Sequence, residues 1–538
     1  MTAYDVPVTR LAPADVAVRD PEPTEPSAQA GVPEIVQRRL RSLSPGPDAW
    51  SWVVAGVVTL VAGIVRLVDL GHPGRIIFDE TYYAPNAYAL LKYGVEWQVQ
   101  EGGANPVNGA PLLGDGPAYV VHPPLGKWMI ALGEWAFGYE PYGWRIAAAL
   151  AGTLSVLMIT RIARRMFGST TLGAAAGLLM ALDGMHLVLS RTALLDIFLL
   201  FFLVAAFGAL LLDRDDRRAR WLAAVADGRP APPSGWRHLP WWRVAAAALL
   251  GAALAVKWSA AAYIPVFLLL AVVWDAGARR SAGVSRPWLA MWRQEWRGLL
   301  AAAVVLPAVY LASWTGWFAS DQGYLRHRLA SIGESEPPVL GALLNLIHYH
   351  RQALAFHLPL ASDHPYASSA WQWLLLGRPV AFYWSGEGAC GAERCASAVL
   401  LLGTPLLWWS FLPALALALW LGIARRDWRV PPILLGAAAG IVPWMIVDRV
   451  SFYFYALPAQ PFLVLAVVYV LGALIAWGQA GRGRDTVLGV DRRTLAVLLA
   501  GAYVLLVALN FAYFYPIYTG QLIPYDGWQA RMWLSSWV

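Results

Sequence analysis

The chain has 538 residues, of which 58% are hydrophobic and only 14% charged, with a formal net charge of +7. Soluble globular domains are about 45–50% apolar and about 25% charged, so this composition excludes an ordinary soluble domain. Apolar runs of about 17–22 residues recur along the chain, each long enough to cross roughly 30 Å of hydrocarbon. They do not alternate residue by residue, so we predict a polytopic helical membrane protein rather than a membrane barrel.

The first 48 residues are rich in Pro, Ala and acids and have no apolar run. We expect them to form a disordered tail, without a cleaved signal peptide, so that the first span acts as an uncleaved anchor. Eleven spans are predicted, near residues 50–69, 143–163, 170–188, 192–212, 243–258, 260–275, 298–314, 401–423, 431–447, 456–477 and 494–515. The Arg-rich connections all fall on one side, which predicts a cytoplasmic N-terminus and an extracytoplasmic C-terminus.

Two long connections, residues 70–142 and 315–400, then lie outside. They contain apolar, aromatic-rich pieces at 124–138 and 368–377, which are too short to span and are expected at the membrane interface. Cys390 and Cys395 lie in the second of these loops. An oxidising exterior favours a disulfide between them, with two free thiols as the alternative. The stretch CGAERC supplies too few ligands for a metal site.

Ionisable groups gather at the outer ends of the predicted spans, where they are costly and usually functional. Each has a simpler explanation: adjacent acids can cap a helix, and a single cation can snorkel to the interface. Their convergence on one face nevertheless indicates one outward-facing site. The group consists of Asp79, Glu80, His122, Lys127, Arg145, Arg191, Asp196, Lys257, Asp363, His364, Asp448 and Arg449.

This combination of side chains fits group transfer from a lipid phosphate. An acid supplies a general base, and Arg or Lys holds a phosphate and stabilises the charge that develops as it leaves. The chain has no Walker loop, HExxH or GxSxG sequence in a suitable context. The basic excess is explained by topology, so we expect no nucleic-acid partner. A transporter would also use buried acids and Arg, but it would need polar groups leading to both faces.

An ordered set of motifs resembles the protein O-mannosyltransferases, without the MIR domain found in eukaryotic members. Order and spacing match from about residue 50 to 515. The motifs are FDETYY (78–83), HPPLGK (122–127), FGYEPYGWR (137–145), SRTALLD (190–196), KWS (257–259), SWTGWF (313–318), HPYASSAWQW (364–373) and RVSFYFYALPAQPF (449–462). The second outer loop is too short for an inserted MIR domain, which points to the bacterial form.

The resemblance implies an all-α GT-C type membrane domain over residues 49–517, with a C-terminal tail at 518–538. It also implies transfer of mannose from polyprenyl-phosphate mannose to Ser or Thr hydroxyls of exported proteins, with inversion at the anomeric carbon. One displacement then suffices, with a base on the acceptor face. A related GT-C transferase acting on a lipid or glycan acceptor is the alternative. No cofactor is required by these motifs, and a single acid pair is a thin site for a divalent cation.

The resemblance also assigns roles by position. Asp79 matches the proposed catalytic base and Glu80 its partner, although adjacent acids could exchange these roles. Donor-phosphate or substrate contacts are expected from Arg145, Lys257, Arg449, Arg191, His122, Lys127 and His364. For Arg145, pairing with Asp79 or Glu80 is the alternative to a phosphate contact. The implied setting is a bacterial plasma membrane with the active site at the outer face, and the implied partners are membrane lipids and a Sec-type export route.

Overall fold

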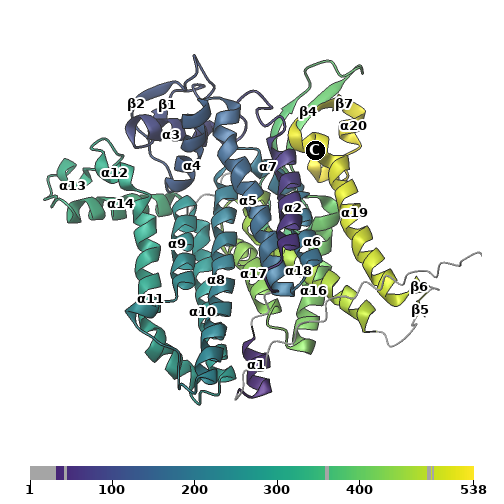
Figure 1. Ribbon diagram of the computed structural model, residues 1–538. Coiled ribbons are helices and arrows are strands. Elements are labelled where there is room, and N and C mark those ends of the chain that lie inside the picture. The colour runs from purple at the N-terminus through teal and green to yellow at the C-terminus, as the bar shows by residue number, and fades with distance from the viewer. Residues whose placement is uncertain (1–31, 42–44, 358–362, 481–485, 488–489) are drawn as a thin grey trace, which may run out of the picture.

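The computed structural model describes residues 32–41, 45–357, 363–480, 486–487 and 490–538. Its core is a bundle of apolar helices that run side by side (Figure 1). Within the described residues, eight helices are long and apolar enough to cross a membrane. They are α2 (Ala49–Leu67), α5 (Pro141–Phe167), α8 (Leu195–Ala226), α10 (Tyr263–Ser281) with η2 (Trp258–Ala262), α11 (Pro287–Ala312), α16 (Pro405–Arg425), α18 (Gln460–Gln479) with η3 (Tyr453–Ala459), and α19 (Arg492–Thr519).

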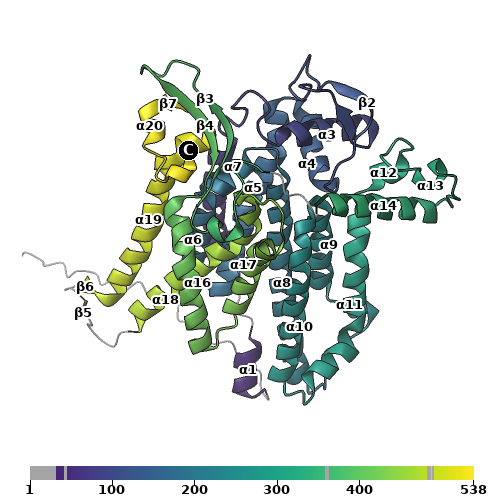
Figure 2. The ribbon, with the colours of Figure 1, turned by 180° about the vertical axis from the view of Figure 1, so that it is seen from behind.

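Three further apolar segments complete the bundle. Helices α6 (Thr170–Ala181) and α7 (Gly184–Ser190) form one pair bent by 65°, while α9 (Trp241–Val256) and α17 (Val430–Ile446) are shorter. Seen from behind, α17 lies between α16 and α10 (Figure 2). Every expected span coincides with a helical segment. Length and composition support eight crossings, or nine with the bent pair, so the total of eleven stays a prediction.

The bend between α6 and α7 is held by one buried acid. Asp183 accepts hydrogen bonds from the backbone N–H of His186 and Thr404 and from the Trp408 indole. Gln460 donates a fourth through its amide. A helix break inside apolar surroundings frees backbone groups that need partners, and a capping carboxylate supplies them. The break therefore brings the SRTALLD segment, which follows α7, back into the bundle.

The two ends of the bundle differ in structure. The upper end in Figure 1 carries α3 (Glu80–Tyr93), α4 (Leu125–Phe137), the strands β1 (Trp97–Val99) and β2 (Leu113–Pro117), and α12 (Thr315–Ala319), α13 (Arg328–Ser331) and α14 (Leu340–His357). Helix α14 lies across the end of α11 rather than along it. The interfacial segment expected at 124–138 is α4, whereas only the short α15 (Ala370–Trp373) forms within 368–377.

A small sheet closes the same end, which the all-α prediction did not include. Its antiparallel strands β3 (Val380–Ser385), β4 (Cys395–Leu401) and β7 (Leu522–Pro524) bring the second long loop against the C-terminal tail, which continues through α20 (Tyr525–Gln529) and η4 (Ser535–Trp537). A disulfide joins Cys390 to Cys395 between β3 and β4. Trp537 is buried against the core, so the tail is part of the fold.

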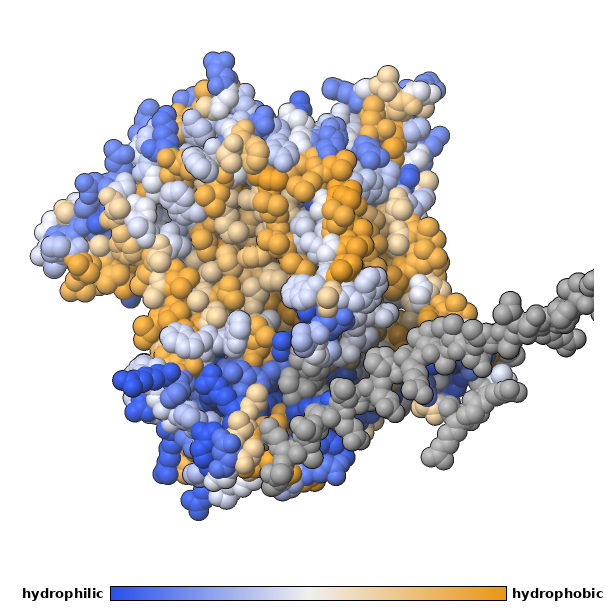
Figure 3. All heavy atoms as spheres, viewed as in Figure 1, coloured by the Kyte–Doolittle hydropathy of each residue, from blue (hydrophilic) through white to orange (hydrophobic). Residues whose placement is uncertain are grey.

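The opposite end is basic and carries α1 (Glu34–Leu40), η1 (Trp236–His238), β5 (Thr486–Val487) and β6 (Val490–Asp491). Disorder through residue 48 is wrong for α1, because Leu40 is fully buried against Trp221 and Ala278. Residues 1–31 of the expected tail lie outside the described residues. Figure 3 shows a hydrophilic zone across this end, below a broad apolar belt.

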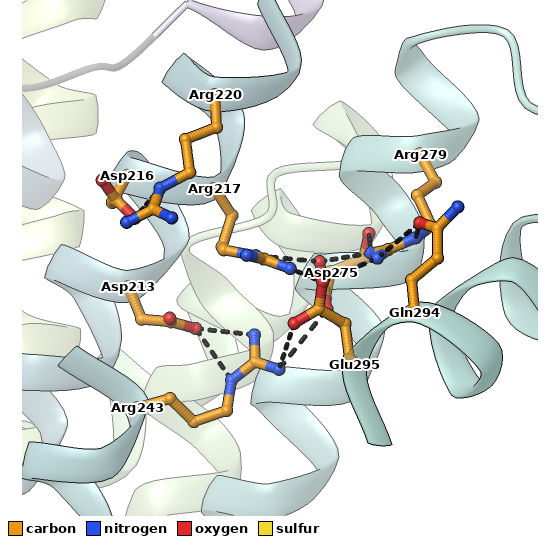
Figure 4. Close-up of polar contacts among 9 residues, drawn as sticks. All are labelled: Asp213, Asp216, Arg217, Arg220, Arg243, Asp275, Arg279, Gln294 and Glu295. Carbon is orange, nitrogen blue, oxygen red and sulfur yellow. Dashed lines mark hydrogen bonds and ion pairs between the residues drawn. The ribbon is translucent and has the colours of Figure 1, made fainter. Parts of the chain in front are cut away.

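Buried ion pairs join four helices near the basic end. Arg243 of α9 lies 2.8 Å from Asp213 of α8, and Arg279 lies 2.5 Å from Asp275 within α10. Glu295 of α11 accepts from Arg279 at 3.0 Å. Breaking a buried pair costs more than forming it gains, so these contacts specify how the helices are arranged. The residues drawn in Figure 4 are Asp213, Asp216, Arg217, Arg220, Arg243, Asp275, Arg279, Gln294 and Glu295.

Candidate active site

Asp79 immediately precedes helix α3 at the upper end of the bundle. The preceding residue, Phe78, has a φ of +47°, which is unfavourable for a bulky side chain. Its ring stacks on Phe382 of β3 at 4.2 Å and meets Phe454 of η3 edge-on at 5.9 Å. These contacts from the second long loop and the bundle hold the strained turn, so the direction of the Asp79 side chain is set by tertiary packing.

Glu80 has a different environment from its neighbour. It is fully buried and accepts hydrogen bonds from the backbone N–H groups of Ile77 and Ala193. Arg145 of α5 donates to both of its oxygens, at 2.7 and 2.8 Å. The Glu80 carboxylate is thus occupied on every side, whereas the Asp79 carboxylate accepts no hydrogen bond from the described residues. This contrast separates two acids that are equivalent in the sequence.

Arg145 is also fully occupied. Besides the two bonds to Glu80, its guanidinium donates to the carbonyl oxygens of Leu70, Pro73 and Arg75 at 2.9–3.3 Å. A guanidinium has five N–H donors, and all are used here. Arg145 is fully buried, so it clamps the loop between α2 and α3 onto α5 and has no donor left for a phosphate.

Arg191 has a similar structural environment at the end of α2. It donates to the carbonyl oxygens of Val65, Arg66, Val68 and Asp69, at 2.6–3.5 Å. The last carbonyl groups of a helix have no partner within that helix, and a cation satisfies them well. Arg191 therefore anchors the start of the first outer loop from below.

Lys257 lies in the break between α9 and η2 and interacts electrostatically with Asp79. Its ammonium contacts both carboxylate oxygens of Asp196, at 2.9 and 3.0 Å, and lies 4.6 Å from the ring centre of Tyr455. Burial raises the pKa of Asp79 to about 6, with Lys257 opposing the shift and Asp196 adding to it. A carboxylate with a pKa near 6 is well matched to accept a proton at neutral pH.

Two imidazoles and Arg449 line the neighbouring surface. His122 lies 5.4 Å from the ring of His357 and 6.3 Å from that of Tyr83. Burial and the surrounding cations, including Lys257 and Arg449, hold the pKa of His122 well below its usual range. The Arg449 Nη1 donates to His357 Nδ1 at 3.0 Å, while Nε2 of that imidazole faces the Val121 carbonyl. His357 is therefore neutral, and Arg449 retains a second terminal nitrogen without an acceptor among the described residues.

The two remaining sequence-predicted residues, Lys127 and His364, differ in burial. Lys127 is buried in an ion pair with Glu96, 2.5 Å away, and donates to the His122 carbonyl, so it supports the HPPLGK turn. His364 is exposed, and its ring packs edge-on against Phe452 at 5.0 Å. Phe452 stacks on Phe454, which places His364 at the rim of the aromatic cluster.

Two cavities flank the Asp79 region. An apolar cavity of about 230 Å³ lies between η2, α17 and η3 and is lined by Trp258, Trp444 and Tyr455. A more polar cavity of about 390 Å³ lies between α3 and the β1–β2 sheet, where Tyr82 and Asn86 line it. Trp258 and Tyr455 of the apolar cavity adjoin Lys257, and Thr81 and Tyr82 of the polar cavity follow Asp79 along the chain.

His357 is the main site residue that sequence reasoning missed. It is the last residue of α14, seven positions after His350, and both imidazoles contact the Trp258 ring. Two His residues separated by seven lie on one helical face, which was the available signal. The role of Asp196 as the partner of Lys257 was also not foreseen, because the two residues are separated by 61 positions.

Two family models match the chain. One, described as dolichyl-phosphate-mannose–protein mannosyltransferase, matches residues 56–320, and the other, the C-terminal four-span region of protein O-mannosyltransferase, matches residues 342–537. A polyprenol-phosphate-mannose–protein mannosyltransferase of Mycolicibacterium smegmatis is 41% identical over 524 residues, covering 92% of this chain and 96% of that protein. One from Mycobacterium tuberculosis is 41% identical over 507 residues, covering 90% and 92%.

The fold has a counterpart among solved structures. The yeast (S. cerevisiae) protein O-mannosyltransferase complex bound to the sugar donor contains a chain with a TM-score of 0.65 and 15% identity, covering 93% of this chain and 94% of that one. At this identity the likeness concerns the arrangement of the helices alone. It supports the GT-C type fold expected from the motifs.

Proposed function

The chain belongs to the polyprenyl-phosphate-mannose–protein mannosyltransferase family, and we propose that it transfers mannose from polyprenyl-phosphate mannose to Ser or Thr hydroxyls of polypeptides. The site assignment rests on the environment of the Asp79 carboxylate. This carboxylate has a raised pKa of about 6, accepts no hydrogen bond within the described residues, and interacts electrostatically with the Lys257–Asp196 pair.

The reaction is a single displacement. The Asp79 carboxylate accepts the proton of the acceptor hydroxyl as its oxygen attacks the anomeric carbon of mannose. The new bond forms as the bond from that carbon to the phosphate oxygen breaks, so the configuration inverts and the electron pair leaves with the polyprenyl phosphate. Glu80 and Arg145 take no part in proton transfer in this proposal. They hold the turn on which Asp79 lies.

Lys257 and Arg449 are the proposed contacts for the donor phosphate. The Lys257 side chain pairs with Asp196 and interacts electrostatically with Asp79, and Arg449 has a terminal nitrogen that His357 does not occupy. A fixed cation favours the transition state because negative charge grows on the phosphate as it leaves. The adjoining apolar cavity, bordered by Trp258 and Tyr455, suits the first isoprene units of the lipid.

The polar cavity beside α3 is the proposed entry for the acceptor. Tyr82 is largely exposed, and Asn86 supplies an amide that pairs with an extended backbone. The His122 ring lies near those of Tyr83 and His357. Its pKa is held well below the usual range, so it is neutral near pH 7 and offers hydrogen bonds without adding charge. His364 at the rim is proposed to contact substrate only as it enters.

The proposed orientation in the membrane places the site at the extracytoplasmic face. The Arg-rich end with α1 would then be cytoplasmic, following the distribution of basic residues that membrane insertion favours. An exported polypeptide emerging from a Sec-type translocon is the acceptor that this orientation implies. Accessibility of introduced cysteines to a membrane-impermeant thiol reagent tests the orientation.

The Asp79→Asn variant tests the catalytic assignment. Loss of a positioned general base costs about 10²–10⁴-fold in rate, so we expect mannose transfer to a Thr-containing peptide to fall by at least about 100-fold. At pH 7 the folded protein should be at least as stable as the unchanged chain. The raised pKa means that folding disfavours the charged Asp79 carboxylate, and Asn removes that charge.

Glu140→Gln is the matched control, since it neutralises an exposed acid at the same end of the bundle. It should transfer mannose at the normal rate. Transfer by Asp79→Asn within about threefold of the control would remove Asp79 from the role of base. Donor binding is followed separately with labelled polyprenyl-phosphate mannose, so that loss of chemistry is distinguished from loss of the substrate.

A further inference from the structure

A second cavity of amphiphilic character lies at the basic end of the bundle, remote from Asp79. Its volume is about 530 Å³, and it is lined by α2, α5, α8 and α9. Arg161, Arg164 and Arg165 lie at one end, with Trp52 and Trp242 beside them. All other lining residues are apolar. A cavity with a cationic mouth and apolar walls matches an anionic amphiphile rather than a sugar or a peptide.

The apolar part runs along the membrane depth. The lining residues of α5 begin at Leu157 and end at Arg165, eight positions later, and those of α8 begin at Val204 and end at Leu212. At 1.5 Å per residue each wall is about 12 Å long, close to the hydrocarbon depth of one leaflet, about 15 Å. Because α5 and α8 run in the same direction, with Arg165 of α5 paired to Asp215 of α8, Leu157 and Val204 lie at one end of the cavity and Arg165 and Leu212 at the other. The charged mouth therefore coincides with the basic end of the bundle.

The arginines at the mouth of the cavity carry more positive charge than the neighbouring carboxylates neutralise. Arg161 packs on the Trp52 ring at 3.7 Å and donates from Nη1 to Ser51, leaving Nε and Nη2 without an acceptor among the described residues. Arg165 uses Nη1 to bind Asp215 at 2.5 Å. These two arginines are four residues apart on one helix, a like-charge spacing that is unfavourable without an anion.

The neighbouring charges do not cancel this excess. Asp215 is shared with Arg214 at 3.1 Å, and Asp48 lies 3.7 Å from Arg164. Four arginines therefore face two carboxylates, Asp48 and Asp215. A phosphate accepts several charge-assisted hydrogen bonds from guanidinium groups and would supply the missing negative charge.

We propose that this cavity binds one anionic phospholipid from the leaflet at the basic end. Its phosphate contacts Arg161 and Arg165, and one acyl chain lies between α5, α8 and α9. Trp52 and Trp242 are both exposed and flank the headgroup, as aromatic residues do at membrane interfaces. The lipid then joins the amino-terminal span to the helices that carry Asp196 and Lys257. This inference does not depend on the proposed transfer reaction.

A substitution at Gly208 tests the apolar part of the cavity, where the acyl chain is proposed to lie, separately from the arginines at its mouth. A Cβ at this position would lie 3.4 Å from the nearest side-chain atom of Ile162, which is ordinary contact, so small additions fit and larger ones enter the cavity. Gly208→Leu should therefore occupy the chain-binding part while the arginines remain in place. Arg161→Ala with Arg165→Ala removes the headgroup part while the walls remain.

The experiment is native mass spectrometry of the full chain, purified in detergent and delipidated, with phosphatidylglycerol added. Zwitterionic phosphatidylcholine, polyprenyl phosphate and inorganic phosphate are titrated in parallel. We expect one phosphatidylglycerol to bind in preference to phosphatidylcholine. The double Arg variant should lose about 100-fold in affinity, about 10-fold for each charged contact. Gly208→Leu should bind the lipid at least tenfold more weakly, with thermal unfolding showing that each variant is folded.

Arg286→Ala with Arg293→Ala is the matched control, because it removes two exposed arginines from the same end of the bundle. Its lipid affinity should be unchanged. Equal losses in both double variants would mean a diffuse charge effect and overturn the site, as would equal binding of the two phospholipids. Inorganic phosphate bound as tightly as the lipid would mean an adventitious ion only. Polyprenyl phosphate binding that falls in the double Arg161 and Arg165 variant as steeply as phosphatidylglycerol binding would overturn the assignment to a phospholipid.

Discussion

Replacing Arg145 by Ala distinguishes a positioning residue from a phosphate ligand. The side chain is fully buried and makes two bonds to Glu80 and three to backbone carbonyls of the first outer loop. Its removal leaves the Glu80 carboxylate buried with only the N–H groups of Ile77 and Ala193. We expect both stability and catalysis to fall, because the turn that holds Asp79 loses its anchor.

The size of the effect follows from the contacts. Removing one partner of a buried ion pair costs about 3–5 kcal/mol, and the lost bonds to carbonyls add to this rather than offset it. Arg145→Lys keeps the charge but not the bidentate geometry, so it should lie between Ala and the unchanged chain. The assay is the free energy of unfolding from SDS titration in detergent micelles, measured with kcat and the donor KM of the folded fraction.

A double-mutant cycle with Glu80→Ala isolates the pair. Glu80 and Arg145 are in direct contact, so the second substitution should cost much less once the first is present, by about 1–3 kcal/mol. The reasoning would be refuted by an Arg145→Ala protein of unchanged stability whose only defect is a higher donor KM. That result would make Arg145 a phosphate ligand, which is one of the two roles that the motif resemblance left open.

The remaining predictions concern pH, the anchor of the first loop, the buried pairs and the donor. Since the pKa of Asp79 is about 6 and only the carboxylate accepts a proton, kcat/KM should fall tenfold per pH unit below pH 6 and level off above it; a flat profile from pH 5 to 7 would contradict this. Arg191→Ala should lower the free energy of unfolding by about 2–4 kcal/mol without changing donor KM, because it contacts backbone carbonyls only. Arg243→Ala should cost about 3–5 kcal/mol in the same SDS titration, since Asp213 stays buried. Arg449→Ala should reduce kcat/KM for the donor by about 10–100-fold with little change in stability.

The sequence predicted the bundle well because hydrophobic runs report span length directly. Each expected span coincides with a helical segment, and α4 forms where a short amphipathic piece was expected to be interfacial. It predicted the sheet poorly, because β7 comes from the C-terminal tail and pairs with β4 more than 120 residues earlier. Pairing over such a distance leaves no local pattern in either segment. The helix α1 was missed since its stability comes from the burial of Leu40 against α8 and α10.

The same division applies to the site. Composition and motif order alone predicted the family, the lipid-phosphate chemistry and the set of charged residues expected at one end of the bundle. The structure alone separates Asp79 from Glu80, because hydrogen-bond partners distinguish two adjacent acids and those partners lie on α5 and after α7. It likewise pairs Lys257 with Asp196 and turns Arg145 and Arg191 toward backbone carbonyls. A charged residue in an apolar sequence shows that its burial costs desolvation free energy. Only the packing decides which partner offsets that free energy, and hence which charged group stays without a partner and free to react.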